Sequence, residues 1–176
     1  MTHSVKCNGM DIDLEADLGP FKAELVCDDG PEAGLYDVRL KLSAGQAATL
    51  PKLTLAWKLP SVDFHYKWNS TCFQIRALDS GTGTENFIKT KANSGMPVYS
   101  LYNLEGVSAC TFALSDVIHD CELGGSYRNG KFYDCRAVIF GEMMSPAAEY
   151  EVTLRFDFRR IPYYQALADV AAWWEA

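Results

Sequence analysis

Apolar and polar residues alternate in three segments of the chain, residues 35–42, 53–59 and 150–158. Successive side chains of a β-strand point to opposite faces of its sheet, so this period gathers the apolar residues on one face. The apolar sets are Tyr36, Val38, Leu40 and Leu42; Leu53, Leu55, Trp57 and Leu59; and Tyr150, Val152, Leu154, Phe156 and Phe158. Polar residues such as Asp37 and Asp157 fall on the opposite face. The pattern predicts strands of antiparallel sheets with one buried and one solvated face.

Weaker strand patterns occur between these segments, and turn residues separate them. The further strands are predicted at residues 21–27, 72–78, 98–104, 109–114 and 131–140, and the turns at residues 28–34, 43–46, 80–83, 103–106 and 128–130. Asn129 and Gly130 are typical of a hairpin that joins Tyr127 to Phe132. Residues 81–84, with the sequence GTGT, lack the lysine of a phosphate-binding loop and are predicted as a surface loop. Many short strands with regular turns predict an all-β, antiparallel β-sandwich.

The period changes near the end of the chain, which predicts one helix. Pro162 suits the first turn of a helix, and the residues after it are rich in alanine and free of glycine. One apolar stripe at helical spacing contains Tyr164, Leu167, Ala168, Ala171 and Trp174, with Trp173 about 100° away. This arc is wider than one small sheet needs, and no capping residue follows Ala176. We therefore predict a sandwich domain over residues 1–160 and, over residues 161–176, a helix that begins the connection to a further domain.

Composition and charge narrow the class of protein. The chain has 176 residues, a formal net charge of −7 and no cluster of Lys and Arg, which disfavours nucleic acid as a partner. No cationic start with an apolar run opens the sequence, and no stretch approaches the roughly 20 apolar residues of a membrane span. These observations predict a cytoplasmic protein without a membrane partner. The six cysteines are then expected to be free thiols.

The residues that could bind a metal or act in catalysis show no spacing typical of a metal site or an active site. Cys110, His119, Cys121 and Cys135 lack the close ligand pairs of zinc sites, so the sequence predicts no metal site and no cofactor. Buried thiols and a surface histidine are the simpler reading. With three histidines and no nucleophile elbow, we also expect no catalytic residue within the chain.

One aromatic segment indicates a binding surface. Phe64, Tyr66 and Trp68 alternate just after Pro60, where a strand end or loop can present flat rings to a sugar. The alternative is that they form the inward face of another strand. Trp68 is expected to be exposed, because polar residues follow it.

Three phrases of the sequence resemble a known family. They occupy residues 53–69, 95–117 and 158–175, with the sequences LTLAWKLPSVDFHYKWN, GMPVYSLYNLEGVSACTFALSDV and FRRIPYYQALADVAAWWE. Together they resemble the N-terminal region of glycoside hydrolase family 36, the α-galactosidases and their relatives. The matching positions are Trp57 and Trp68, Pro97 to Gly106, Thr111 to Asp116, and Asp157, Arg159 and Pro162. The family often has Asn and Arg after that glycine, where this chain has Val107 and Ser108.

The resemblance implies an architecture and a role. The fold would be a galactose-mutarotase-like β-supersandwich packed beside a catalytic (β/α)₈ barrel, which in the family holds two catalytic aspartates. Both aspartates would lie beyond Ala176, so this chain would be the non-catalytic domain of an enzyme of carbohydrate metabolism that acts on α-galactosides. Four helix residues would pack between the domains: Tyr164, Leu167, Trp173 and Trp174. Two alternatives remain, a free-standing carbohydrate-binding sandwich and an oligomerisation module, so a saccharide and a second copy of the chain are further partners.

Overall fold

The structure is a computed structural model that describes residues 3–59, 66–69, 75–77, 82–89, 96–128 and 131–176. For residues 66–69, 75–77 and 82–89, and for residues 127, 128 and 131–133, only the course of the backbone is described. Neither helix of the described chain has the length and apolar character that a membrane-spanning helix requires.

The described residues form strands, one short 3-10 helix and one α-helix. In chain order these are β1 (His3–Cys7), β2 (Met10–Glu15), β3 (Lys22–Asp29), β4 (Leu35–Ala48), β5 (Lys52–Trp57), β6 (Tyr66–Asn69), β7 (Ile75–Ala77), β8 (Thr82–Lys89), β9 (Val98–Tyr102), β10 (Ser108–Leu114), β11 (Cys121–Arg128), β12 (Lys131–Phe140), η1 (Gly141–Met143), β13 (Ala147–Asp157) and α1 (Tyr163–Glu175).

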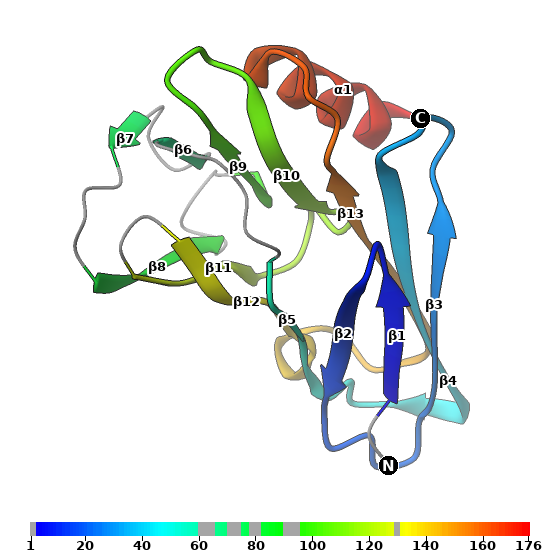
Figure 1. Cartoon of the computed structure of the whole chain (residues 1–176). Helices are drawn as coiled ribbons and strands as arrows, with labels where there is room; N and C mark the ends of the chain where they lie inside the picture. The colour runs from blue at the N-terminus through cyan, green and yellow to red at the C-terminus, as the bar shows by residue number, and fades with distance from the viewer. Residues whose placement is uncertain (1–2, 60–65, 70–74, 78–81, 90–95, 129–130) are drawn as a thin grey trace.

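The strands build two sheets that face each other (Figure 1). One sheet has the order β1-β2-β5-β12-β11-β8, and the other has the order β3-β4-β13-β10-β9-β6-β7. Every pair whose register is described is antiparallel. The predicted all-β, antiparallel sandwich with one C-terminal helix is therefore confirmed.

The space between the sheets is filled by the alternating residues. Leu53 and Leu55 of β5 and Leu40 and Leu42 of β4 are completely buried, as the alternation predicts. Phe112 of β10 lies at the centre of a group of aromatic rings. Its ring centroid is 5.2 Å from those of Trp57 and Tyr99, and 6.4 Å from that of Phe156. Close packing of rings at these distances stabilises the core beyond the burial of area.

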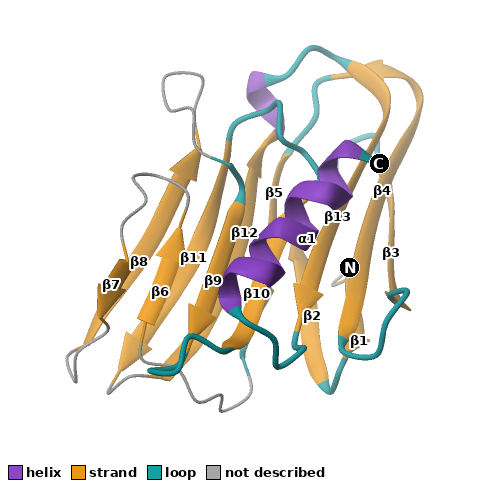
Figure 2. Ribbon diagram, turned by 90° about the horizontal axis from the view of Figure 1, so that it is seen from above, coloured by secondary structure: helices purple, strands orange, loops and turns teal. Residues whose placement is uncertain are grey.

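Helix α1 lies across the outer face of the seven-stranded sheet, above β9 and β10 (Figure 2). Both faces of these strands are consequently covered, and every residue of β9 and β10 is buried. The expectation that strand 150–158 has a solvated outer face is wrong at Asp157, which is 1% exposed. The reason is that the chain turns back after β13 and places α1 beside this face of the sheet.

Three local expectations are also corrected. Residues 82–84 of the GTGT segment begin strand β8 instead of a loop, and residues 43–46 continue β4 instead of turning. In α1 the buried residues are Ala166 and Val170, so the predicted stripe is rotated from the face that meets the sheet. A pattern of spacings cannot choose between two apolar faces of one helix, since both have the same period.

Candidate functional site

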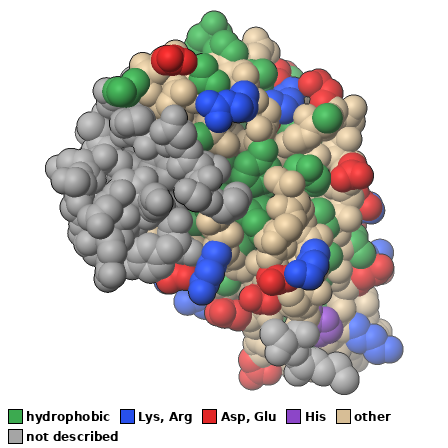
Figure 3. All heavy atoms as spheres, in the orientation of Figure 1, with side chains coloured by type: hydrophobic (Ala, Val, Ile, Leu, Met, Phe, Trp, Pro, Cys, Tyr) green, Lys and Arg blue, Asp and Glu red, His purple; other side chains and the backbone are tan. Residues whose placement is uncertain are grey.

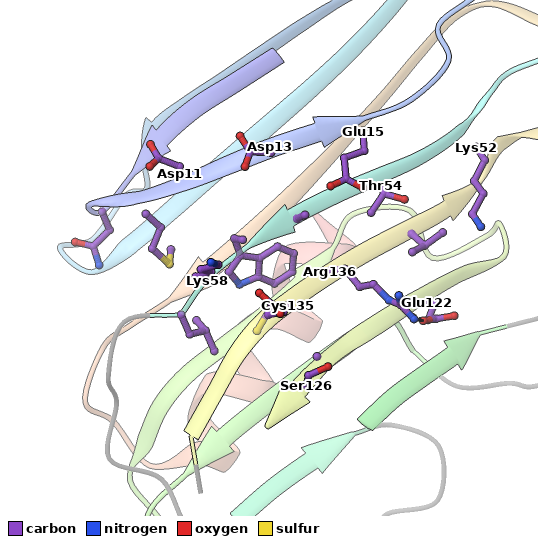
Figure 4. Close-up of a pocket in the computed structure, with 18 of the residues that line it drawn as sticks. Asp11, Asp13, Glu15, Lys52, Thr54, Lys58, Glu122, Ser126, Cys135 and Arg136 are labelled. Atoms are coloured by element: carbon purple, nitrogen blue, oxygen red, sulfur yellow. Dashed lines mark hydrogen bonds and ion pairs between the residues drawn. The ribbon is translucent and has the colours of Figure 1, made fainter. Parts of the chain in front are cut away.

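A groove of about 1080 Å³ crosses the outer face of the six-stranded sheet (Figure 4). Strands β2, β5, β11 and β12 supply its side chains, because every second residue of each strand points away from the sandwich core. The floor includes the small or uncharged residues Thr54, Ala56, Gly125, Ser126 and Val138. The groove thus has short side chains along its floor and longer side chains at its borders.

Charged groups of both signs border this groove. Asp11, Asp13 and Glu15 follow one another along β2 on one side (Figure 4). On the other side the Nη2 of Arg136 is 2.7 Å from the Oε1 of Glu122. Carboxylates accept and guanidinium groups donate hydrogen bonds, so a polyhydroxylated ligand would find partners for both functions of its hydroxyl groups.

An ion-pair network fixes the start of α1 to the sheet. The buried carboxylate of Asp157 accepts hydrogen bonds from the backbone N–H of Arg159 at 2.9 Å and from its Nε and Nη2 at 3.0 and 2.7 Å. Arg159 also reaches Asp169 of α1 at 2.7 Å and Glu32 at 2.8 Å. The hydrogen bonds to Asp157 are the main reason that the pKa of Arg159 is raised, and those to Glu32 and Asp169 add to it against the effect of burial. The guanidinium therefore stays charged and ties α1, β13 and the β3–β4 connection together.

The turn between β9 and β10 provides a second attachment for α1. The Oδ1 of Asn103 accepts hydrogen bonds from the N–H groups of Glu105 and Val107, which closes the turn. Gly106 has φ of +75°, a conformation that glycine adopts without strain, and its carbonyl accepts the N–H of Tyr163 at 2.9 Å. Val107 forms a β-bridge with Pro162, the residue before the first turn of the helix. Residues from the second and third phrases of the resemblance therefore meet at one place, where the helix begins.

The underside of α1 packs on the sheet through its second half. Val170, with Leu167, Trp173 and Trp174, packs against apolar residues of β9 and β10. The indole N–H of Trp174 donates to the carbonyl of Leu114 at 2.8 Å. The guanidinium carbon of Arg155 lies 4.2 Å from the ring centroid of Trp173, a cation–π contact.

The opposite side of α1 carries four apolar residues, together with Gln165 and Glu175, and no described part of the chain covers it. Tyr164, Ala168, Ala171 and Ala172 are exposed and follow one another at helical spacing. We call these four residues the outer stripe. Tyr164 is 64% exposed, and hydrophobic side chains reach the surface at the end of the molecule that carries α1 (Figure 3). The helix contains no Lys or Arg, so the outer stripe has no basic residue within its own helix.

A third polar cluster closes the connection between β10 and β11. The Oδ2 of Asp116 accepts the hydroxyl of Tyr150 at 2.7 Å and lies 2.8 Å from the Nδ1 of His119. Burial raises the pKa of Asp116, but the hydrogen bonds from Tyr150 and His119 outweigh it and leave the pKa below its usual value. Burial and the charge of Asp116 raise the pKa of Tyr150. The cluster fixes the chain where it passes from one sheet to the other.

We expect Asp116→Asn to lower the free energy of unfolding by about 2 kcal/mol at pH 7, because it weakens hydrogen bonds to a charged acceptor. The pKa of Asp116 is depressed in the folded state, so its contribution is present above the unfolded pKa of about 4 and is lost as pH falls through the folded pKa. Urea unfolding at pH 7 and near pH 3 measures this: the difference between the two proteins should shrink at the lower pH. An equal difference at both values would contradict the assignment.

The aromatic residues that the sequence analysis selected are only partly described. Phe64 lies outside the described residues, and Tyr66 and Trp68 lie on β6, of which the backbone alone is described. Sugar contacts by these three rings stay a prediction. The charged residues of the groove were not selected from the sequence, although Asp11, Asp13 and Glu15 alternate with apolar residues that are all buried. That alternation was the signal that could have found one wall of the groove.

The proposed interdomain residues separate into two groups. Leu167, Trp173 and Trp174 are half-buried against the sheet of this chain, whereas Tyr164 belongs to the outer stripe. Contact with a further domain stays a prediction for all four.

The cysteines lie mainly in the core. Cys7, Cys110, Cys121 and Cys135 are buried and Cys27 is half-buried, and no disulfide joins these five described residues. Burial raises the pKa of Cys135 to about 12, while a backbone hydrogen bond from Leu59 acts in the other direction. Within the described ranges, no group of three or more His, Cys, Asp or Glu side chains could hold a metal ion.

Comparison with known proteins finds matches among solved structures. No protein-family model matches the sequence, and neither does any curated protein. A crystal structure from Escherichia coli K12, described as a "Putative aldose 1-epimerase", aligns with a TM-score of 0.48 and 7% identity. The alignment covers 91% of this chain and 69% of that chain. The likeness identifies no site residue in this chain.

Proposed function

We propose that this chain is the non-catalytic N-terminal β-sandwich domain of an α-galactosidase-like glycoside hydrolase. In this proposal the outer stripe of α1 packs against a catalytic (β/α)₈ barrel of the same polypeptide, and the barrel performs the hydrolysis of α-galactosides. The observation that carries the proposal is that the sheet covers one side of α1 and that the outer stripe stays exposed on the other. Apolar residues on more than one side of a helix favour a position between two packed layers.

The attachment of α1 supports the same role. Residues that resemble the family fix the start of the helix: Asp157 pairs with Arg159, and the carbonyl of Gly106 accepts the N–H of Tyr163. Pro162 forms a β-bridge with Val107. They are structural residues with no acid–base or nucleophilic arrangement around them. A domain whose distinctive residues position one helix is suited to present that helix to a neighbour.

The first test is enzymatic. The purified chain is expected to leave an aryl α-galactoside unhydrolysed, whereas the product of the reading frame continued beyond Ala176 should hydrolyse it. Hydrolysis of the galactoside by the 176 residues alone would overturn the proposal. A stop codon directly after the codon for Ala176 would overturn it too.

A substitution in the outer stripe tests the contact between domains. Ala168→Glu is expected to change the unfolding of the isolated chain by less than about 0.5 kcal/mol, because Ala168 is exposed there. In the longer protein the same change buries a charge and should lower the melting temperature by several degrees. Lys41→Glu, on an exposed position of β4, is the matched control. Equal effects of Ala168→Glu on both proteins would speak against packing through this stripe.

The groove favours a second candidate function, saccharide binding by the sandwich itself. Arg136→Met is expected to weaken the binding of a recognised oligosaccharide about tenfold, as the loss of one charge-assisted hydrogen bond would. Arg39→Met is the matched control, because Arg39 likewise pairs with one carboxylate, Asp28, on the other sheet. Calorimetry with a panel of neutral oligosaccharides measures both. No heat with any of them would remove this candidate.

A further inference from the structure

Strands β1 and β3 close one edge of the sandwich. Each is the last strand of its own sheet, and the two lie side by side in both views of the fold (Figures 1 and 2). Hydrogen bonds between their backbones do not join them, since they belong to different sheets. Side-chain packing therefore contributes to holding this edge closed.

Two cysteines meet across this edge. Cys7 is the last residue of β1 and is completely buried, and Cys27 of β3 is half-buried and packs against the same core. The side chains of Cys7 and Cys27 are close enough that each affects the pKa of the other. Cys27 pairs in register with Val38, whose side chain also points into the core. Both sulfurs therefore face the same space between the sheets.

We propose that Cys7 and Cys27 form a disulfide bond when the protein meets a small disulfide oxidant such as oxidised glutathione, and that this bond covalently joins the two sheets. The pair is a redox modification site that leaves the other described thiols reduced. Cys110 and Cys135 are buried, so they lack the solvent access of Cys27.

The reaction has two exchange steps. The half-buried Cys27 sulfur, as the thiolate, attacks one sulfur of oxidised glutathione, and the S–S bond breaks to release one glutathione thiolate. The Cys7 sulfur then loses its proton and attacks the Cys27 sulfur of the mixed disulfide, which releases the second glutathione. Two protein thiols are oxidised, one glutathione disulfide is reduced to two glutathione molecules, and the two protons end on these products. Burial raises the pKa of both thiols, so the reaction is slow at neutral pH.

Peptide mapping of the oxidised wild-type protein tests the site without any substitution. After incubation with oxidised glutathione at mildly alkaline pH and alkylation of the remaining thiols, one peptide pair joined through Cys7 and Cys27 is expected. The intact protein should lose the mass of two hydrogen atoms. The melting temperature should rise by roughly 5 to 10 °C and return on reduction, because the bond closes a loop of about 20 residues.

Variants assign the order of the steps. Cys7→Ala should stop at a glutathione adduct on Cys27, whereas Cys110→Ala should still form the bond. Oxidation that joins any other pair, or wild-type protein that retains a stable glutathione adduct on Cys27, would overturn the proposal. The same treatment in guanidinium should give mixed pairings, and a single Cys7–Cys27 product there would show that the fold does not direct the reaction.

Discussion

Replacement of Asp157 by alanine is expected to lower the free energy of unfolding by about 3 kcal/mol, the loss seen when one partner of a buried ion pair is removed. Asp157 is 1% exposed and accepts three hydrogen bonds from Arg159, whose own side chain is only 11% exposed. Without the carboxylate, the guanidinium stays charged next to a cavity. The expected decrease in the free energy of unfolding is at the lower end of the range for buried ion pairs, because Arg159 keeps Glu32 and Asp169 as partners.

The effect should concentrate in α1, because Arg159 connects β13 to this helix. Hydrogen exchange of the backbone amides of residues 163–175 should accelerate more than that of the central strands. Asp169→Ala is the matched control: it removes a more exposed carboxylate from the same guanidinium and should cost less than about 1 kcal/mol. If Asp157→Ala unfolds at the same denaturant concentration as the wild type, the network does not anchor the helix.

Replacement of Phe112 by alanine is expected to lower the free energy of unfolding by about 3 to 5 kcal/mol, which is typical of a large aromatic deletion in a core. Phe112 is completely buried, and its ring lies between Trp57 of one sheet and Tyr99 of the other. The deletion opens a cavity where the two sheets meet. Equilibrium urea unfolding followed by tryptophan fluorescence measures the loss.

Two further variants show whether packing is the cause. Phe112→Leu fills most of the space and should cost less than Phe112→Ala. Leu104→Ala, in an exposed turn, should change stability by less than about 0.5 kcal/mol. A loss at Leu104 as large as that at Phe112 would mean that the aromatic group is not the centre of the core.

Local patterns in the sequence were sufficient to predict many of the strands and the α-helix. The prediction of strand 131–140 coincides with β12, and Tyr127 pairs with Phe132 across the predicted hairpin. The helix begins directly after Pro162, as its fixed φ favours. Strands β1, β2 and β8 were not predicted, β6 was predicted only as an alternative, and β11 was predicted only at its hairpin end. For β2 the signal was present, since Met10, Ile12 and Leu14 alternate with acidic residues.

The candidate sites depended on contacts between distant parts of the chain. The groove combines β2 and β5 with β11 and β12, which come more than a hundred residues after β2, and no spacing along the sequence indicates that these strands are neighbours. The thiols of Cys7 and Cys27 meet only because β1 and β3 close the same edge. Strand order is set by the packing of two whole sheets, so it cannot be read from a single segment.

The sequence by itself determined the class of the fold, the position of its helix and which face of β4, β5 and β13 enters the core, because these follow from periods of two and 3.6 residues. Tertiary structure decided the rest. It placed α1 on the outer face of one sheet, which buried Asp157 beside Arg159 and left the outer stripe uncovered. The burial of Asp157 and the exposure of the outer stripe both depend on which face of α1 packs on the sheet. That packing forms only when the whole chain has folded around one shared core.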